Sequence, residues 1–100
     1  MHPAKVDRHH LIQLTDLPNI GPALADDLRR IGYLSPQALA GADAFDMYAR
    51  LCAITGQRHD PCVLDAFLSV TDFMRGAEPR PWWEYTPRRK ALCARGARGG

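Results

Sequence analysis

Apolar residues recur along this chain at the spacing of α-helices, in short blocks that proline and glycine separate. In one such block, Leu24, Leu28 and Ile31 fall on a single helical face. Pro22 stands at a first helical position, where its missing N–H costs nothing, and Gly32 is a natural C-terminal stop. The pattern therefore predicts a helix from Pro22 to about Ile31.

Two longer helices are predicted from the same kind of pattern. One runs over about 44–55, after the capping residue Asp43, and the other over about 61–75, after Asp60; a glycine ends each of them. The expected core positions of the first are Met47, Tyr48, Leu51 and Ile54. Those of the second are Val63, Leu64, Phe67, Leu68, Val70, Phe73 and Met74.

Two shorter helices complete the expected fold. One lies over about 8–15 with Asp7 as its cap, and one over 36–40, where Ser35 and Pro36 give a cap followed by a first-turn proline. No window of the chain alternates apolar and polar residues well enough to be a strand. The sequence therefore predicts an all-α fold of about five short helices packed on one core.

The chain changes character after residue 76, because three prolines stand within 77–90 and exclude a single helix there. Trp82, Trp83 and Tyr85 carry too much apolar surface to be left exposed. We therefore expect an extended C-terminal strap in which Trp82 and Trp83 cover the helical core.

Length and composition agree with a single domain. One hundred residues, 46% apolar and 24% charged, are typical of a small globular protein. We expect the domain over residues 8–90 and a disordered basic tail over 91–100. No apolar run approaches the roughly 20 residues that span a bilayer, and the first ten residues lack the apolar stretch of a signal peptide. A cytoplasmic protein with no membrane partner is therefore expected.

The net charge is only +2, but it is unevenly placed. Residues 1–78 carry seven Lys and Arg against ten Asp and Glu, whereas residues 79–100 carry six Lys and Arg against Glu84 alone. A near-neutral body with a basic tail allows an acidic partner, above all nucleic acid, and it equally fits a tail that only aids solubility.

Cysteine and histidine spacing does not predict a metal site. Cys52, His59 and Cys62 are close in sequence, but their spacing matches none of the common zinc patterns. Cys62 falls in the first turn of a predicted helix, where the dipole favours the thiolate, but the neighbouring Asp60 opposes it. We therefore expect a buried structural thiol rather than a reactive one. The chain also shows no paired carboxylates, no nucleophile beside a base and no glycine-rich nucleotide loop. We expect no metal, no cofactor, no small-molecule substrate and no enzymatic activity.

The turn before the helix at Pro22 carries the most specific chemistry in the chain. Asn19 and Gly21 tolerate positive φ and allow a tight turn, while Ile20 is placed to plug the gap between the flanking helices. The N–H groups of Gly21, Ala23 and Leu24 then point outward at the positive end of a helix, which is a site for a phosphate group. Contacts of that kind carry no sequence information.

This stretch, from Leu14 to Gly32, resembles the helix-hairpin-helix motif, and the resemblance implies DNA binding at the turn. The basic residues expected to assist are Arg29, Arg30, Arg88, Arg89 and Lys90. One departure from the motif matters. Where such hairpins usually place Lys or Arg after the Gly-Pro pair, this chain has Ala23, Asp26 and Asp27, whose carboxylates repel a phosphate.

A wider set of residues resembles the bacterial pathogenicity-locus family, whose members are often described as mitomycin-resistance proteins. The set comprises Leu-Pro-Asn-Ile-Gly-Pro-Ala from Leu17, the segment from Leu51 to Asp65 around Asp60-Pro61-Cys62, and Pro81-Trp82-Trp83. The hairpin is also similar to the C-terminal domain of TfoX-type competence regulators. These resemblances imply a helix-hairpin-helix fold with DNA binding, and no established activity.

Two functions remain open at this point. The first is a small non-enzymatic protein that grips the DNA backbone through the turn without sequence specificity. The second is a protein-interaction module in which the hairpin is structural and the strap docks an unknown protein partner. The position of Arg88, Arg89 and Lys90 relative to the turn discriminates between the two readings.

Overall fold

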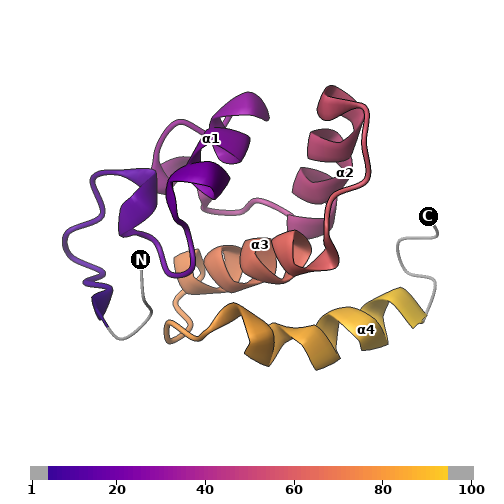
Figure 1. Ribbon diagram of the computed structural model, residues 1–100. Helices are drawn as coiled ribbons and strands as arrows, with labels where there is room; N and C mark the ends of the chain where they lie inside the picture. Colours follow the sequence, from indigo (N-terminus) through magenta and orange to yellow (C-terminus); the bar gives the residue numbers. More distant parts are fainter. Residues whose placement is uncertain (1–4, 95–100) are drawn as a thin grey trace.

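Helix α3, Pro61–Met74, runs through the middle of the molecule, and the other elements pack around it (Figure 1). Its residues from Leu64 to Thr71 are buried without a break, and so is Phe73. One side of α3 contacts α2 (Ala44–Thr55), and another contacts the C-terminal segment. The helix is therefore apolar nearly all round because it has packing partners on more than one face.

The computed structural model describes residues 5–94, and within that range every regular element is helical. The expected all-α class is confirmed. In chain order the elements are η2 (Leu14–Asp16), α1 (Pro22–Arg30), η3 (Pro36–Leu39), α2, α3, η4 (Trp82–Tyr85) and α4 (Thr86–Ala94), where η marks a 3-10 helix. None of the helices in the described part of the chain is long and apolar enough to cross a membrane.

The predicted bounds of α1, α2 and α3 agree with the structure to within a residue or so. Asp43 caps α2 by accepting the Phe45 N–H at 2.9 Å, and Gly56 ends that helix with φ of 70°. One expected core position is wrong: Ile54 is 57% exposed, whereas Ala44 at the start of α2 is buried. Local capping signals fix where these helices begin and end.

The helix expected over 8–15 is wrong, since only the three residues of η2 are helical there. Asp7 does accept the His9 N–H, at 2.9 Å, but this bond closes a turn rather than a helix. The Asp16 carboxylate accepts the backbone N–H groups of Ile12 and Gln13, at 2.9 and 2.8 Å. These bonds hold the preceding backbone in a bend, and they lower the pKa of Asp16.

The expected extended strap is also wrong, because residues 82–94 form η4 and α4, which lie along α3 (Figure 1). Pro87 falls in the first turn of α4, where a missing N–H is tolerated. The tail therefore does not begin at residue 91: residues 91–94 belong to α4, and 95–100 lie outside the described residues.

Trp82 and Trp83 do not cover the core as expected. Their exposed fractions are 37% and 57%, and the aromatic side chain that packs inward is Tyr85, at 5%. The Tyr85 hydroxyl donates to the Asp72 carboxylate of α3 at 3.2 Å. Burial and the nearby Asp72 charge raise the pKa of Tyr85 to about 12. Polar bonds to α3 thus set the orientation of this segment, and they turn Tyr85 inward.

Candidate nucleic-acid interface

The turn between η2 and α1 has the conformation that the sequence predicts at two of its positions. Asn19 has φ of 66°, the one positive value at a non-glycine residue in the described part of the chain. Ile20 is completely buried, and Ala25 on α1 is 1% exposed, so the plug and the small residue sit where expected. The hairpin is therefore well formed, although its first helix is only a 3-10 turn.

Asn19 also has a role that the sequence does not reveal. Its side-chain amide nitrogen donates to the Ser69 hydroxyl at 2.9 Å and to the Arg80 carbonyl at 2.7 Å. Its amide oxygen accepts the Trp82 backbone N–H at 3.2 Å. The turn is thus fastened both to α3 and to the segment that enters η4.

Gly21 differs from the expectation, because its φ is −89° and its ψ is −177°. This is extended backbone that any residue adopts, so the turn does not need a glycine here for its conformation. A Cβ atom added at Gly21 meets nothing within 4 Å. Packing does not need a glycine at this position either.

The donors of the turn are nevertheless available. Gly21, Pro22 and Ala23 are exposed, and Gly21 is the N-cap of α1 with no side chain to fill the helix end. No hydrogen bond among the described residues uses the N–H of Gly21, Ala23 or Leu24 as donor. The positive end of α1 therefore has three amide groups without a hydrogen-bond partner among the described residues, two of them on exposed residues and one on the half-buried Leu24.

The arginines of α1 lie at its other end, roughly 10 Å from the turn at 1.5 Å per residue. Arg29 pairs with Asp26 at 2.8 Å, and Arg30 lies 4.0 Å from Asp27. The acidic pair that departs from the usual hairpin pattern is thus balanced by these two arginines on the same helix. Neither arginine is brought to the turn.

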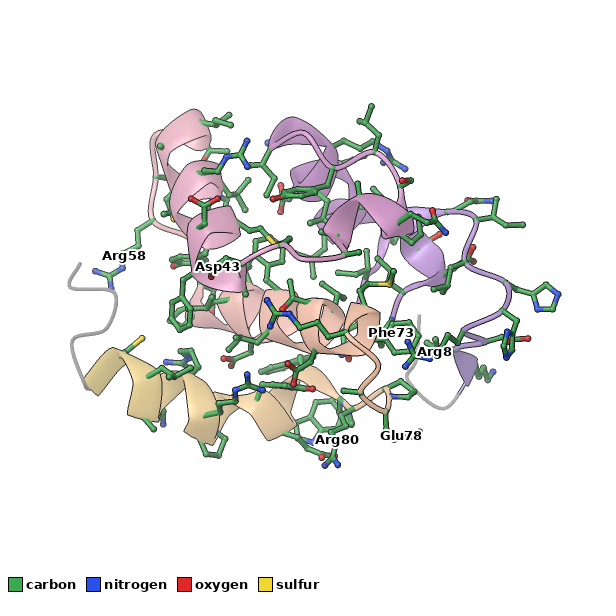
Figure 2. The ribbon with its side chains drawn as sticks, turned by 180° about the vertical axis from the view of Figure 1, so that it is seen from behind. Arg8, Asp43, Arg58, Phe73, Glu78 and Arg80 are labelled. Atoms are coloured by element: carbon green, nitrogen blue, oxygen red, sulfur yellow. The ribbon has the colours of Figure 1, made fainter. Side chains whose placement is uncertain are left out.

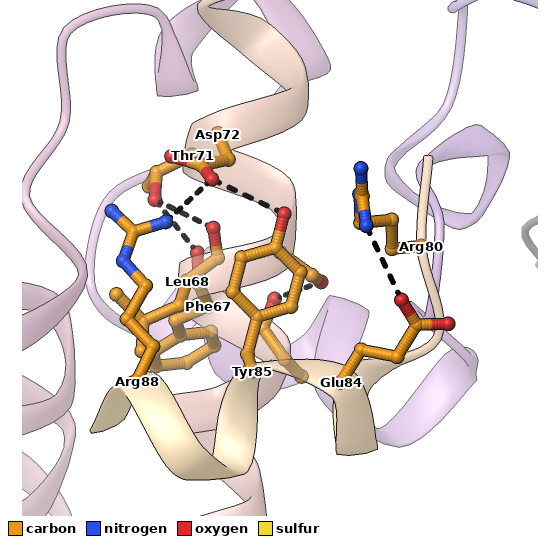
Figure 3. A network of polar contacts seen from close by, with 10 residues as sticks. Phe67, Leu68, Thr71, Asp72, Arg80, Glu84, Tyr85 and Arg88 are labelled. Carbon is orange, nitrogen blue, oxygen red and sulfur yellow. Dashed lines mark hydrogen bonds and ion pairs between the residues drawn. The ribbon is translucent and has the colours of Figure 1, made fainter. Parts of the chain in front are cut away.

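Arg88 and Arg89 are bound to α3. Arg88 contacts the Asp72 carboxylate at 2.6 Å (Figure 3). The Arg89 Nε donates to the Asp65 carboxylate at 2.9 Å, and the Thr86 hydroxyl donates to the same carboxylate at 2.7 Å. Asp65 is 1% exposed, and its hydrogen bond raises the pKa of Arg89. These guanidinium groups face α3 rather than an external phosphate, whereas Lys90 is exposed.

Other arginines in the body make internal bonds as well. Arg8 donates to the carbonyls of Phe73 and Ala77, both at 2.6 Å, and lies 4.0 Å above the Phe73 ring (Figure 2). Figure 2 also shows Arg58 and Arg80 well apart, so these two do not form one basic patch. Of the thirteen Lys and Arg, only Arg95 and Arg98 lie outside residues 5–94, which leaves equal numbers of basic and acidic residues in the described part.

The structure instead places a different set of residues beside the turn. Arg80, whose side chain is 58% exposed, leads into η4 and lies 3.5 Å from Glu84 (Figure 3). The exposed rings of Trp82 and Trp83 follow, with centroids 5.7 Å apart and planes at 84°. The sequence shows that Trp82 and Trp83 carry a large apolar surface. It does not show that the Trp82 backbone bonds to Asn19.

A shallow depression of about 540 Å³ lies between the end of α3 and η4. Its charged lining residues are Asp72, Glu78, Arg80, Glu84 and Arg88. Asp72 is bonded to Arg88 and Tyr85, and Arg80 to Glu84 (Figure 3). Both arginines of the depression are thus paired with carboxylates, and Glu78 leaves its lining acidic by one charge.

The cysteines do not form a reactive or metal-binding cluster in the part of the chain that is described. Cys52 and Cys62 are half-buried, Cys93 is exposed, and no group of three His, Cys, Asp or Glu residues within 5–94 is arranged to hold a metal ion. Burial, with a further contribution from Asp60, raises the pKa of the Cys62 thiol. The partial burial agrees with the expectation for Cys62, and its structural role stays a prediction.

Comparison with known proteins gives two matches. A family model described as "Pathogenicity locus" (Cdd1) matches residues 7–91. The mitomycin resistance protein McrB of Streptomyces lavendulae is 44% identical over 81 residues, which cover 81% of this chain and 77% of that protein. No solved structure matches.

Proposed function

The chain belongs to the pathogenicity locus family, and from the geometry of its hairpin we propose that it binds DNA without reading sequence. In this proposal the protein is not an enzyme. The N–H groups of Gly21, Ala23 and Leu24 hold a backbone phosphate at the positive end of α1. The name of the Streptomyces relative suggests mitomycin resistance as the setting in which such binding acts.

The observation that carries the proposal is the glycine at position 21. Glycine is tolerated at an N-cap position, but Asn, Asp and Ser rank above it because their side chains accept the free N–H groups of the first turn. The backbone at Gly21 suits any of these residues, and a Cβ atom there has open space. A glycine that neither backbone conformation nor packing requires is explained by a ligand that approaches the backbone closely.

The distribution of charge makes this binding weak. Arg29, Arg30, Arg80, Arg88 and Arg89 all pair with carboxylates of the same chain, and Lys90, Arg95 and Arg98 are among the few basic residues left to bind DNA. Each phosphate neutralised by a cationic side chain contributes about −0.9 to the slope of log affinity against log salt. We therefore expect a slope between roughly −1 and −3 and affinity in the micromolar range.

The test is fluorescence anisotropy of a labelled duplex at two salt concentrations, with the wild type and an Ala23→Lys variant. Ala23 is exposed on α1, so lysine fits and supplies the cation that DNA-binding hairpins usually carry there. Tighter binding with a steeper salt slope supports the proposal. An unchanged affinity and slope refutes contact at the turn.

A protein-docking function is the second candidate, and the internal pairing of Arg88 and Arg89 favours it. In that reading Asn19 fastens a purely structural hairpin, and any DNA affinity comes from the basic end of the chain. Truncation after Ala94 separates the two functions, since it removes Arg95 and Arg98 and leaves α4 whole. If truncation abolishes DNA binding and Ala23→Lys leaves the affinity for DNA unchanged, protein docking is the remaining function.

A further inference from the structure

Trp82 and Trp83 are exposed on η4, the segment that packs against the core through Tyr85. Trp83 is 57% exposed and Trp82 is 37% exposed, whereas Tyr85 supplies the buried aromatic contact. The two rings stand edge to face, with centroids 5.7 Å apart and planes at 84°. Tryptophans are enriched at interaction surfaces, so an adjacent exposed pair points to one here.

The backbone that carries these rings is fastened to the hairpin turn. Asn19 accepts the Trp82 N–H at 3.2 Å and donates to the Arg80 carbonyl at 2.7 Å. Gly21 is two residues from Asn19, a distance of at most about 7 Å along an extended chain. The start of α1 and the segment that carries the rings are thus joined through Asn19.

This juxtaposition joins two kinds of nucleic-acid contact. Amide N–H groups at a helix end bind phosphate, and aromatic side chains stack on bases whose faces are free. Bases inside an intact duplex are stacked on one another and offer no free face, whereas unpaired bases do. The exposed Arg80 side chain, 3.5 Å from Glu84, supplies a cation to the backbone only where phosphate replaces that carboxylate.

We propose that Trp82 and Trp83 form a stacking platform for unpaired bases, so that the protein prefers single-stranded or frayed DNA to a closed duplex. The proposal rests on DNA binding at the turn, and it names the form of DNA that the same surface takes. The planes of the two rings are nearly perpendicular, so a single flat base cannot lie on both of them. Stacking therefore involves individual bases and is tolerant of sequence.

Nucleic acid is favoured over an apolar protein partner by what surrounds the rings. The neighbouring groups are the backbone donors of the turn, which suit phosphate, and the exposed Arg80–Glu84 ion pair, rather than a continuous apolar surface. The other large apolar side chains that are exposed within residues 5–94 are those of Ile12, before η2, Leu34, between α1 and η3, and Ile54, on α2. None of these three residues lies in the segment from Arg80 to Trp82 that bonds to Asn19.

Intrinsic fluorescence of the full chain tests the platform directly, because Trp82 and Trp83 are its only tryptophans. Three probes of equal length are titrated into the protein: single-stranded oligothymidine, an abasic strand with the same number of phosphates, and a fully paired duplex whose ends do not fray. We expect strong quenching by oligothymidine alone. Its affinity should exceed that of the abasic strand by roughly 5- to 150-fold, the range typical of one stacked base.

Variants identify the residues responsible. Trp83→Ala should remove the preference for oligothymidine over the abasic strand, and Trp83→Phe should keep most of it. Leu34→Ala, which truncates a side chain that is 74% exposed elsewhere, is the matched control and should change nothing. Anisotropy with labelled strands follows binding where a tryptophan has been removed, and thermal unfolding checks that each variant folds.

The outcomes separate this proposal from the function on which it rests. Equal affinity for oligothymidine and the abasic strand, with binding still strengthened by Ala23→Lys, overturns the stacking platform and leaves phosphate binding intact. Absence of binding to all three probes overturns both, and the exposed tryptophans are then a surface for a protein partner. The platform is supported if Trp83→Ala loses the preference for oligothymidine over the abasic strand while Trp83→Phe and Leu34→Ala retain it.

Discussion

The side-chain amide of Asn19 donates a hydrogen bond to the Ser69 hydroxyl at 2.9 Å, which joins the hairpin turn to the central helix across 50 residues of sequence. The same side chain bonds the backbone of Arg80 and Trp82. Asn19 therefore has two separable roles, since its backbone adopts positive φ and its side chain holds two distant segments.

Two substitutions at Asn19 distinguish these roles. Asn19→Gly keeps the positive φ and removes the bonds, so it should lower the free energy of unfolding by about 1–2 kcal/mol. Asn19→Ala removes the bonds and also strains the backbone, adding roughly 1 kcal/mol. Urea unfolding measures both. Equal stability of Asn19→Ala and wild type would show that the side-chain bonds contribute nothing.

Arg89 is expected to be a structural residue. Asp65 is 1% exposed, so Arg89→Ala leaves a buried carboxylate with Thr86 as its remaining donor, and should cost about 3–5 kcal/mol of stability. Arg29→Ala, which breaks an exposed pair on α1, should change stability by less than about 1 kcal/mol. Thermal unfolding compares the two variants. Similar small losses for both would mean that the Asp65–Arg89 pair does not anchor α4.

Tyr85 predicts a loss of stability at high pH. Burial and the Asp72 charge raise its pKa to about 12, above its ordinary value near 10, so folding favours the protonated phenol. Its stabilising contribution is complete below pH 10 and is lost as the pH rises from about 10 to 12. The difference in stability between wild type and Tyr85→Phe, measured by urea unfolding across that range, should shrink. A stability difference between wild type and Tyr85→Phe that stays constant from pH 10 to 12 would contradict a raised pKa for Tyr85.

Signals that act over a few residues allowed the helix bounds to be predicted. Pro22 and Pro61 at first helical positions, Asp43 as a cap, and the glycines that follow the helices fix α1, α2 and α3 locally. The C-terminal segment could not be predicted in this way, because its conformation depends on its bonds to α3. Asp65, Ser69 and Asp72 recur at helical spacing on α3, and all three accept bonds from outside that helix. Polar residues at that spacing in an apolar helix are a signal that a second segment packs there.

The candidate site was predicted only in part for a similar reason. The turn and its free donors depend on neighbouring residues, so Asn19, Ile20 and Gly21 drew attention in the sequence. The neighbourhood of Trp82 depends on bonds to Asn19, which is 63 residues away along the chain. Arg88 and Arg89 looked available because the sequence does not show which carboxylates they meet.

The most direct test of phosphate binding at the turn replaces Gly21 with aspartate. Asp suits the extended backbone of this N-cap, and its carboxylate accepts the N–H of Ala23 or Leu24 and balances the positive helix end. We expect Gly21→Asp to leave stability unchanged or to raise it by up to about 1 kcal/mol.

DNA binding should change in the opposite direction. The carboxylate occupies the donors and repels phosphate, so the affinity of Gly21→Asp for labelled DNA, measured by anisotropy, should fall at least about tenfold, the equivalent of one lost charge-assisted bond. Gln57→Glu, which adds the same charge to an exposed loop after α2, is the control and should bind nearly as the wild type does. Stability maintained with binding lost is the predicted result. A folded Gly21→Asp that binds DNA as tightly as the wild type would contradict the account.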